Sequence, residues 1–280
     1  MKYEILLIDG PYLAHRSHTA PYSLKTKSGL DATMIHNFIR SLNATFKKFK
    51  PDHVGICWES HGTQSWRRLL YPDYKPSGTI EADFREALND LRVLLHLLKI
   101  KQFYAPGNEA DDVLCAIVTQ HAKDRSAVIF TRDKDLMQLI YDPEPAVHVW
   151  DGKQIFNEAE VIKKFGVTSY QLCDYLSLVG DKVDNIPGVK GIGPKNAVKL
   201  IKKYINVEAI PIEEFPKGDD SFMEAINAKR LITLNYEANV QPVFKSDITF
   251  QETIEDILNK YELESIKEKL DEYKKIGGSE

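Results

Sequence analysis

The chain has 280 residues and 43% of them are hydrophobic, which is enough for one large domain or for a domain with a smaller appendage. A net charge of −4 at pH 7 is not typical of a nucleic-acid-binding protein, although acids gathered at one metal site would leave the remaining surface positive. Because no apolar run approaches the length of a membrane span and the N-terminus leads straight into a strand, we expect a cytoplasmic protein with no membrane partner.

Strands and helices are expected to alternate in the first half of the chain. Continuous apolar runs predict buried strands at residues 3–8, 53–58, 100–104, 126–130 and 146–150. Amphipathic patterns predict helices at 31–49, where Asp31 is a suitable cap, and at 81–99. This alternation indicates an α/β fold with a central, mostly parallel sheet flanked by helices.

A helix with an acidic first turn is expected to begin near residue 108. Asn108 follows a Pro-Gly turn and stands where an N-cap belongs, and an apolar helix runs on from it. Glu109, Asp111 and Asp112 occupy the first turn, where the helix dipole favours negative charge. At about 100° per residue, Glu109 and Asp112 project to nearly the same side and Asp111 is turned away. Taken alone, this pattern is typical of an ordinary acidic helix start.

The second half of the chain is expected to be mostly helical. A short helix should follow residue 135, and helices should run from about 158 to 204, interrupted at 180–185 and by a glycine-rich turn. Residues 211–220 indicate a loop, and a charged helical tail follows residue 251 and ends in disordered residues 277–279. We therefore expect an α/β core over 1–157 and a mostly helical region over 158–280.

Acidic side chains stand at or just beyond the ends of the predicted strands. They are Asp9, Glu59, Asp133 and Asp135, and the helix that begins near Glu109 follows a further strand. Because ligands of parallel sheets bind at the carboxyl ends of the strands, we expect these acids to converge. Converging carboxylates need cations, and oxygen ligands without Cys or His select Mg²⁺ or Mn²⁺. Two such ions roughly 4 Å apart would suit in-line phosphoryl displacement.

A glycine-rich turn is the second candidate site. Gly191 and Gly193 flank Ile192, and Pro194 opens a helix at its favoured first position. Exposed backbone N–H groups in such a turn can bind a phosphate, with Lys195 adding charge, and this contact would not read base sequence. The alternative is an ordinary corner between two helices.

Five motifs together resemble those of the 5′ nuclease family, which includes flap endonucleases, bacteriophage 5′ exonucleases and the 5′→3′ exonuclease domain of bacterial DNA polymerase I. The similarity covers almost the whole chain and fades after Phe250. The motifs are Ile8-Asp9-Gly10 with Arg16 following, and those at residues 109–112, 131–135, 180–188 and 191–195.

The resemblance implies two metal clusters. The first matches Asp9, Glu109, Asp111 and Asp133, with Asp112 binding through water. The second matches Asp135, Asp181 and Asp184.

The resemblance also implies DNA contacts. Arg67 and Lys75 match the basic pair of a helical arch at about 60–90, where they contact the scissile phosphate. A helix-two-turn-helix at about 180–204 would hold duplex DNA and a K⁺ ion on backbone carbonyls. The implied DNA-binding residues are Arg16, Arg68, Tyr74, Gly191, Gly193 and Lys195, and the implied K⁺ ligands are the carbonyls of Val189 and Ile192. Packing within the arch is the alternative role for its aromatic residues.

Two positions depart from the family pattern. Glu59 stands where the family usually has Asp, so it reaches one methylene further and its metal contact would pass through water. Residues 76–79, Pro-Ser-Gly-Thr, replace the usual basic residue after the arch lysine, which predicts a less positively charged arch.

The resemblance implies a monomeric Mg²⁺-dependent nuclease that cuts DNA with 5′ flaps or 5′ ends, as flap endonuclease and 5′→3′ exonuclease, in replication or repair. One alternative is a catalytically silent protein that binds DNA junctions on the same fold. A second alternative is a ribonuclease with a similar acid cluster, which the length and the phosphate-binding turn disfavour.

Overall fold

The computed structural model describes residues 2–60, 62–75, 81–245 and 249–278. Within them a central sheet has the strand order β6-β5-β4-β1-β2-β3-β7. The five inner strands are parallel, and β6 and β7 pair antiparallel at the two edges. The strands are β1 (Ile5–Asp9), β2 (His53–Cys57), β3 (Lys101–Tyr104), β4 (Ala127–Phe130), β5 (Val147–Trp150), β6 (Ile155–Phe156) and β7 (Gln241–Pro242).

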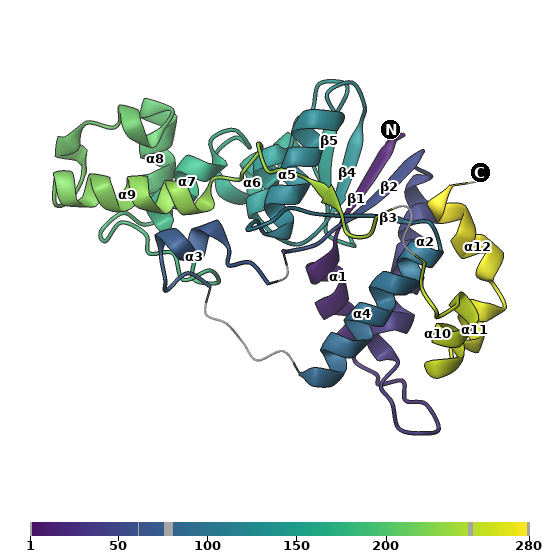
Figure 1. The fold of residues 1–280 in the computed structure, drawn as a ribbon. Helices are drawn as coiled ribbons and strands as arrows, with labels where there is room; N and C mark the ends of the chain where they lie inside the picture. The colour runs from purple at the N-terminus through teal and green to yellow at the C-terminus, as the bar shows by residue number, and fades with distance from the viewer. Residues whose placement is uncertain (1, 61, 76–80, 246–248, 279–280) are drawn as a thin grey trace.

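Helices surround this sheet and extend beyond it at both ends (Figure 1). In the first half they are α1 (Gly10–His18), α2 (Thr33–Phe49), α3 (Trp66–Leu70), α4 (Ala82–Leu97), α5 (Ala110–His121) and the 3₁₀ helix η1 (Asp135–Leu139). In the second half they are α6 (Glu158–Phe165), α7 (Leu172–Val179), α8 (Pro194–Tyr204), α9 (Asp219–Ile232), α10 (Ile254–Lys260), α11 (Glu264–Lys267) and α12 (Leu270–Lys274). Short 3₁₀ turns are η2 (Val207–Ala209), η3 (Ile212–Glu214) and η4 (Lys275–Gly277).

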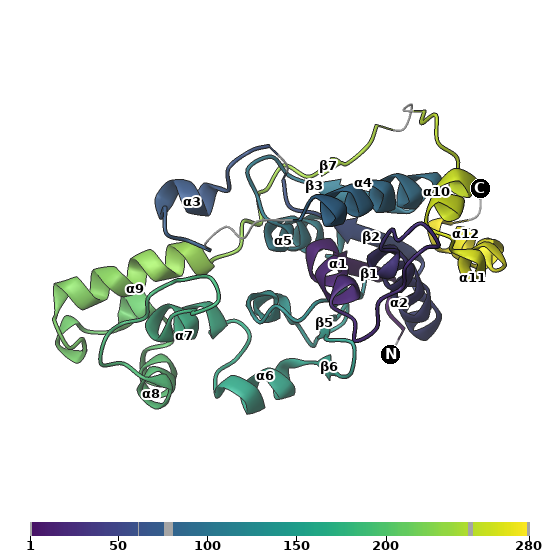
Figure 2. The same ribbon diagram turned by 90° about the horizontal axis from the view of Figure 1, so that it is seen from below.

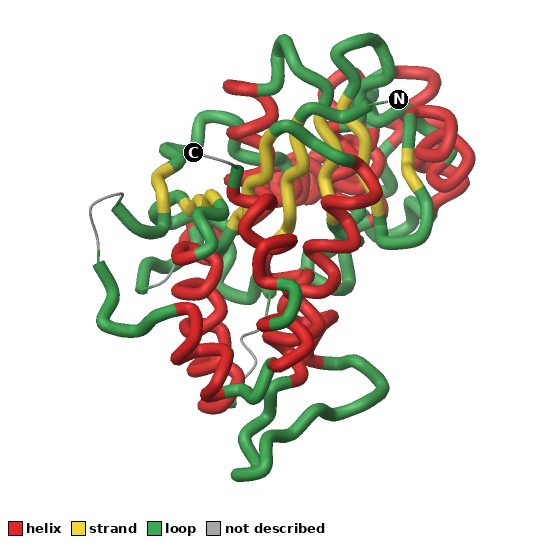
Figure 3. Tube along the Cα trace, turned by 90° about the vertical axis from the view of Figure 1, so that its right-hand side faces the viewer, coloured by secondary structure: helices red, strands yellow, loops and turns green. Residues whose placement is uncertain are grey.

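Both faces of the sheet are covered, as expected for parallel strands that read as continuous apolar runs. Because side chains alternate along β1, Leu6 and Ile8 pack into the hydrophobic cluster shared with α1, α2 and α4. Ile5 and Leu7 pack into the other cluster, which contains α5 and the helices of the second half. Figures 2 and 3 show helices on either side of the strands. The expected α/β fold is confirmed.

The helices α7, α8 and α9 form a lobe at one end of the molecule (Figure 1). The turn between α7 and α8 depends on close backbone contact, because a Cβ on Gly188 would collide with the backbone of Val179. Gly180 and Gly191 have φ values of 77° and 97°, in the left-handed region that glycine adopts without strain. These glycines therefore allow the segment after α7 to fold back against the C-terminal end of α7.

The C-terminal tail packs on the α/β core, at the end opposite this lobe (Figure 1). Tyr261 is buried and donates a hydrogen bond to Asp90 on α4 at 2.7 Å. Lys260 pairs with Glu86 at 2.8 Å and with Asp90 at 2.7 Å. The prediction of disorder was wrong for Gly277, where a Cβ would collide with the carbonyl oxygen of Leu98. Ser279 lies outside the described residues.

Several elements escaped the pattern analysis. The edge strands β6 and β7 have two residues each, too few to show alternation. The short helix α3 lies between residues 60 and 80, where the sequence shows no clear periodicity, and α9 begins at Asp219, within the predicted loop. The residues after 135 form a 3₁₀ helix rather than an α-helix. Within the described ranges, no helix is both long and apolar enough to cross a membrane.

Candidate metal centre

Asp9 ends β1 and caps α1 at the carboxyl edge of the sheet. Its carboxylate accepts the Tyr12 amide at 3.0 Å and the Thr131 hydroxyl at 2.7 Å. Asp9 is buried, and burial raises its pKa to about 6 although both hydrogen bonds favour the ionised form. This carboxylate is therefore held rigidly in a site that disfavours its own charge.

Asp133 follows β4, and its charge acts on several of the other acids predicted to bind metal. Its negative charge contributes to raising the pKa of Asp9, Asp111 and Asp135, in each case behind the larger effect of burial. It acts in the same way on Asp184. Acids from β1, β4, α5 and the turn after α7 therefore converge around Asp133.

The acidic helix start differs from its prediction. The N-cap of α5 is Glu109 rather than Asn108, and the Asp112 carboxylate accepts the Glu109 amide at 3.3 Å. Asp111 faces the acids: besides burial, the charges of Asp112, Glu109 and Asp133 raise its pKa. The expectation that Asp111 would be turned away was wrong, because Asp112 is the residue that points elsewhere.

Asp112 on α5 and Arg67 on α3 form a buried pair. The Arg67 guanidinium donates to both Asp112 oxygens, at 2.7 and 2.8 Å, and to the Leu231 carbonyl at 2.7 Å. The exposed fractions of the two side chains are 1% and 0%. Asp112 also accepts the Asn235 amide at 2.8 Å. Arg67 also lies 3.3 Å from Asp111, so it joins Asp112 to the edge of the acid cluster. In this structure each of the pair binds the other inside the protein, and the roles predicted for Arg67 at the scissile phosphate and for Asp112 at a metal ion stay predictions.

Asp135, Asp181 and Asp184 form a second group beside Asp133. One carboxylate oxygen from each lies within 4.8 Å of the others. Burial, followed by the charge of Asp133, raises the pKa of Asp135 to about 8. Its Oδ1 is buried and accepts no hydrogen bond from any described residue. Three oxygen donors with one unpartnered buried oxygen fit a hard divalent cation.

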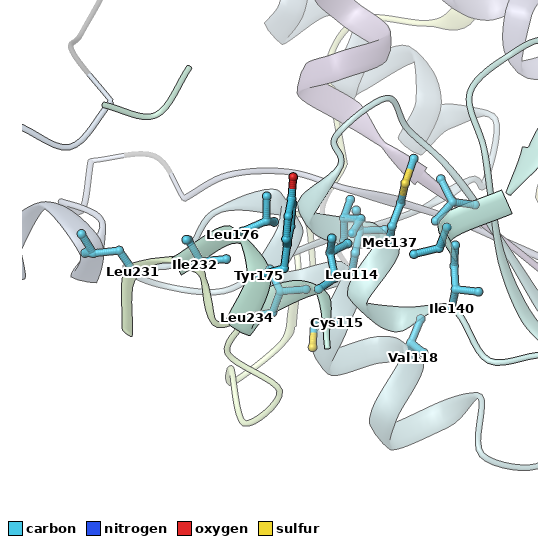
Figure 4. Packing of buried hydrophobic residues seen from close by; sticks show 14 of the residues in the cluster. Leu114, Cys115, Val118, Met137, Ile140, Tyr175, Leu176, Leu231, Ile232 and Leu234 are labelled. Carbon is cyan, nitrogen blue, oxygen red and sulfur yellow. The ribbon is translucent and has the colours of Figure 1, made fainter. Parts of the chain in front are cut away.

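Hydrophobic packing fixes the segments that carry these acids. Leu114 of α5, Met137 of η1 and Leu176 of α7 belong to one buried cluster, as does Leu231 at the end of α9 (Figure 4). Since α5 carries Asp111, η1 begins at Asp135, and Asp181 and Asp184 follow α7, the cluster fixes the relative positions of the acidic segments. The second group is therefore assembled by contact between the two halves of the chain.

Among the predicted metal ligands Glu59 alone is exposed, and the others are buried or half-buried. It is exposed after β2 and faces Arg92, whose pKa burial lowers to about 10 and Glu59 partly restores. Its metal role therefore stays a prediction, and the interaction of Glu59 in this structure is with Arg92.

Tyr74 and Lys75, which follow α3, contact two of the acids. The Tyr74 hydroxyl donates to Glu109 at 3.1 Å and to Asp184 at 3.2 Å, and its ring is buried, which favours the alternative of packing over a DNA contact in this structure. Lys75 Nζ pairs with Glu109 at 3.1 Å, and its side chain is 48% exposed. Burial alone would lower the pKa of Lys75, but Glu109 and Asp184 raise it on balance. In the sequence, the Tyr-Lys pair that follows Arg67 and Arg68 was the signal for a contact between this segment and the acids.

The remaining candidates lie apart from the acids. Arg16 stacks over the Phe130 ring at 5.3 Å, and Arg68 is half-buried in α3. Gly191, Gly193 and Lys195 are exposed at the start of α8. The Val189 carbonyl accepts the Ile192 amide at 3.0 Å. The arch residues 61 and 76–80, including the Pro-Ser-Gly-Thr segment, lie outside the described residues.

Residues 4–166 match the family described as 5′-3′ exonuclease, N-terminal resolvase-like domain. The chain belongs to the 5′-3′ exonuclease family. Residues 167–245 match the same family's C-terminal SAM fold.

Relatives in bacteria resemble most of the chain. A 5′-3′ exonuclease of Aquifex aeolicus is 32% identical over 96% of this chain and 91% of its own length. The flap endonuclease Xni of Shewanella pealeana is 36% identical over 74% of this chain and 79% of its own. The thermostable DNA polymerase I of Thermus aquaticus is 35% identical over 75% of this chain but only 25% of its own length.

Solved structures share the fold. A zinc-bound T5 5′-exonuclease has a TM-score of 0.62 at 21% identity, covering 81% of this chain and 86% of its own. Flap endonuclease-1 from Methanococcus jannaschii has a TM-score of 0.58 at 17% identity, covering 98% and 93%.

Mg²⁺ is expected to stabilise the protein more at pH 8.5 than at pH 5. Because the pKa values of Asp9 and Asp135 are raised in the folded state, their contribution to metal-free stability is present in acid and is lost as pH rises through about 6 and about 8. A divalent ion requires the ionised carboxylates, so its binding strengthens over the same interval. Thermal unfolding with Mg²⁺ and with EDTA across this pH range measures the difference, and a Mg²⁺ shift that is independent of pH would contradict it.

Proposed function

We propose that the protein is a Mg²⁺-dependent, structure-specific 5′ nuclease that hydrolyses phosphodiester bonds in DNA bearing 5′ flaps or 5′ ends. The observation that carries this proposal is the convergence of acids from four segments around Asp133, in a chain of the 5′-3′ exonuclease family. Cleavage near the junction of duplex and flap is the expected reaction, in DNA replication or repair.

Two groups of carboxylates could hold the ions. The first comprises Asp9, Glu109, Asp111 and Asp133, and the second comprises Asp135, Asp181 and Asp184. When bound, Mg²⁺ or Mn²⁺ supplies an activated water and stabilises the charge that develops in an in-line displacement. All-oxygen ligands support these two ions over zinc, which prefers nitrogen and sulfur.

Lys75 is the side chain best placed to meet a phosphate at this centre. Its ammonium stays charged because the acids raise its pKa, and about half of the side chain is open to solvent. Glu109 holds the ammonium at the rim of the acid cluster, and Tyr74 anchors the neighbouring backbone by bonding to Glu109 and Asp184. A fixed ammonium there would stabilise negative charge in the transition state.

The turn before α8 is proposed to hold the duplex. Gly193 caps α8 without a side-chain hydrogen bond, and Pro194 has no N–H, so the amides of Lys195 and Asn196 are the donors that could meet a phosphate at the start of this 11-residue helix. We also propose DNA contacts for Arg16, Arg68 and Gly191, and a K⁺ ion on the carbonyls of Val189 and Ile192. Such contacts would not distinguish base sequences.

A monomer in the cytoplasm is the proposed working form. The three cysteines are unpaired, and two of them, Cys57 and Cys115, are buried, which suits a reducing compartment. The proposed functional division keeps an α/β nuclease core with its arch and a helical region that binds duplex DNA.

Cleavage assays on matched DNA and RNA flaps, with Mg²⁺ and with chelator, test the proposal. We expect the DNA flap to be cut near its junction only when Mg²⁺ is present. Binding to the DNA flap without cleavage would support a catalytically silent protein, and equal cleavage of the RNA flap would support a ribonuclease.

Lys75→Ala is expected to lower kcat by about 10²-fold, the usual cost of one preorganised donor to transition-state charge, and to change DNA affinity little. Single-turnover cleavage and equilibrium binding of the same flap separate the two effects. Lys195→Ala is the matched control and should weaken DNA binding with little change in single-turnover rate at saturation. An unchanged kcat in Lys75→Ala would exclude the proposed role.

A further inference from the structure

Lys134 lies inside the second group of acids. It stands between Asp133 and Asp135, at the start of η1. Its ammonium donates a short hydrogen bond to Asp181 and lies 3.8 Å from Asp135 Oδ1. The side chain is only 28% exposed. A cation of the protein itself therefore lies among the carboxylates proposed to bind metal.

The charges around Lys134 explain this position. Asp135, Asp181 and Asp184 are all buried, and each brings a carboxylate oxygen within 4.8 Å of the others. Three carboxyl groups at this spacing in a partly desolvated site cannot all ionise without a positive charge beside them. Burial alone would lower the pKa of Lys134, but Asp135, Asp181 and Asp133 raise it on balance, so the ammonium stays charged.

The hydrogen bond of Lys134 also places Asp181. One Asp181 oxygen accepts the ammonium, and the other accepts the Val183 amide at 2.9 Å. Both oxygens therefore accept hydrogen bonds, whereas Asp135 Oδ1 accepts none within the described ranges and has only the Lys134 ammonium 3.8 Å away. An incoming ion would meet an oxygen without a hydrogen bond on Asp135 and an occupied one on Asp181.

We propose that the Lys134 ammonium is a built-in counter-ion of the Asp135–Asp181–Asp184 group, and that a divalent ion must displace it to bind there. The proposal rests on the proposed metal dependence and goes further, because it assigns a residue that tunes the affinity of one site. Lys134 lowers the affinity of the second ion, since part of the binding free energy is spent in moving the ammonium away from Asp181. The first group, centred on Asp9 and Asp111, is then expected to fill first.

Titration of the DNA-free protein with Mn²⁺ tests this proposal without any activity measurement. Isothermal calorimetry gives the number of ions bound and the affinity of the weaker one. The test variant is Lys134→Met, which keeps much of the side-chain length and removes the charge. Lys134→Arg retains a cation at the same position. Lys182→Met is the matched control, because it removes an equal charge from an exposed position between Asp181 and Asp184.

In Lys134→Met, the weaker Mn²⁺ ion should bind about tenfold more tightly than in the unaltered protein, a coupling of ordinary size between two ligands of one site. Lys134→Arg and Lys182→Met should change this affinity by less than about threefold. Unchanged or weaker binding in Lys134→Met would overturn the proposal while leaving the nuclease assignment intact. If the unaltered protein binds no Mn²⁺, the proposed metal dependence itself fails.

Discussion

Asp133→Asn is expected to reduce DNA cleavage by at least about 10³-fold, because a lost ligand forfeits several kcal/mol of metal-assisted transition-state stabilisation. Asp133 is the carboxylate that acts on Asp9, Asp111, Asp135 and Asp184 together, so it borders both acid groups. The fold should survive, since an asparagine oxygen can still accept the Asp135 amide that Asp133 Oδ1 now accepts at 2.9 Å.

DNA binding should be retained in Asp133→Asn, because the substitution removes a negative charge from a site that faces phosphates. Single-turnover cleavage and equilibrium binding of a 5′ flap measure the two quantities. Asp124→Asn is the matched control, since it makes the same chemical change at an exposed turn. A cleavage rate within tenfold of the unaltered protein would refute the role of Asp133.

Arg67→Ala is expected to destabilise the protein by about 3–5 kcal/mol, because it leaves the carboxylate of Asp112 charged, buried and without its bidentate partner. Arg67 also donates to the carbonyl of Leu231, so the substitution releases the end of α9 from α3. Urea unfolding measures this loss. Arg67→Lys should recover only part of it, since an ammonium cannot reproduce the two parallel hydrogen bonds.

A double variant separates structure from catalysis. Arg67→Met with Asp112→Asn removes both charges, and the asparagine oxygen can still accept the Asn235 amide, so we expect most of the lost stability to return. If Arg67 instead touched the scissile phosphate, Arg67→Ala would leave stability unchanged and lower cleavage alone. That result would restore the role predicted for Arg67 from the sequence.

The sequence predicted the strands and part of the acidic site correctly where apolar periodicity and the position of strand ends were clear. Apolar runs located the five parallel strands, and Asp9 and Asp133 follow directly from the rule that ligands gather at the carboxyl ends of such strands. Asp181 and Asp184 were reached only through family motifs, because nothing in local pattern indicates that the turn after α7 packs beside η1. That contact depends on long-range burial of residues such as Leu176 and Met137.

The errors share one physical cause. Charge and spacing do not reveal whether a side chain points to solvent or into the protein. Arg67 and Asp112, 45 residues apart, were assigned to different ligands, whereas in this structure they bind each other. Tyr74 was expected at DNA for the same reason, although its ring is buried, and Glu59 was grouped with the acids although its side chain is exposed and acts on Arg92. Pairing between distant charges is set by the tertiary fold.

The packing of the final helices has a practical consequence for anyone who shortens this polypeptide. The family match ends at residue 245, yet Ile257, Tyr261 and Ile266 beyond it are each 3% exposed or less. Ending the chain at residue 245 would remove these residues from α2 and α4 and leave an apolar surface exposed to water. Such a fragment should self-associate even with every acid and the phosphate-binding turn intact.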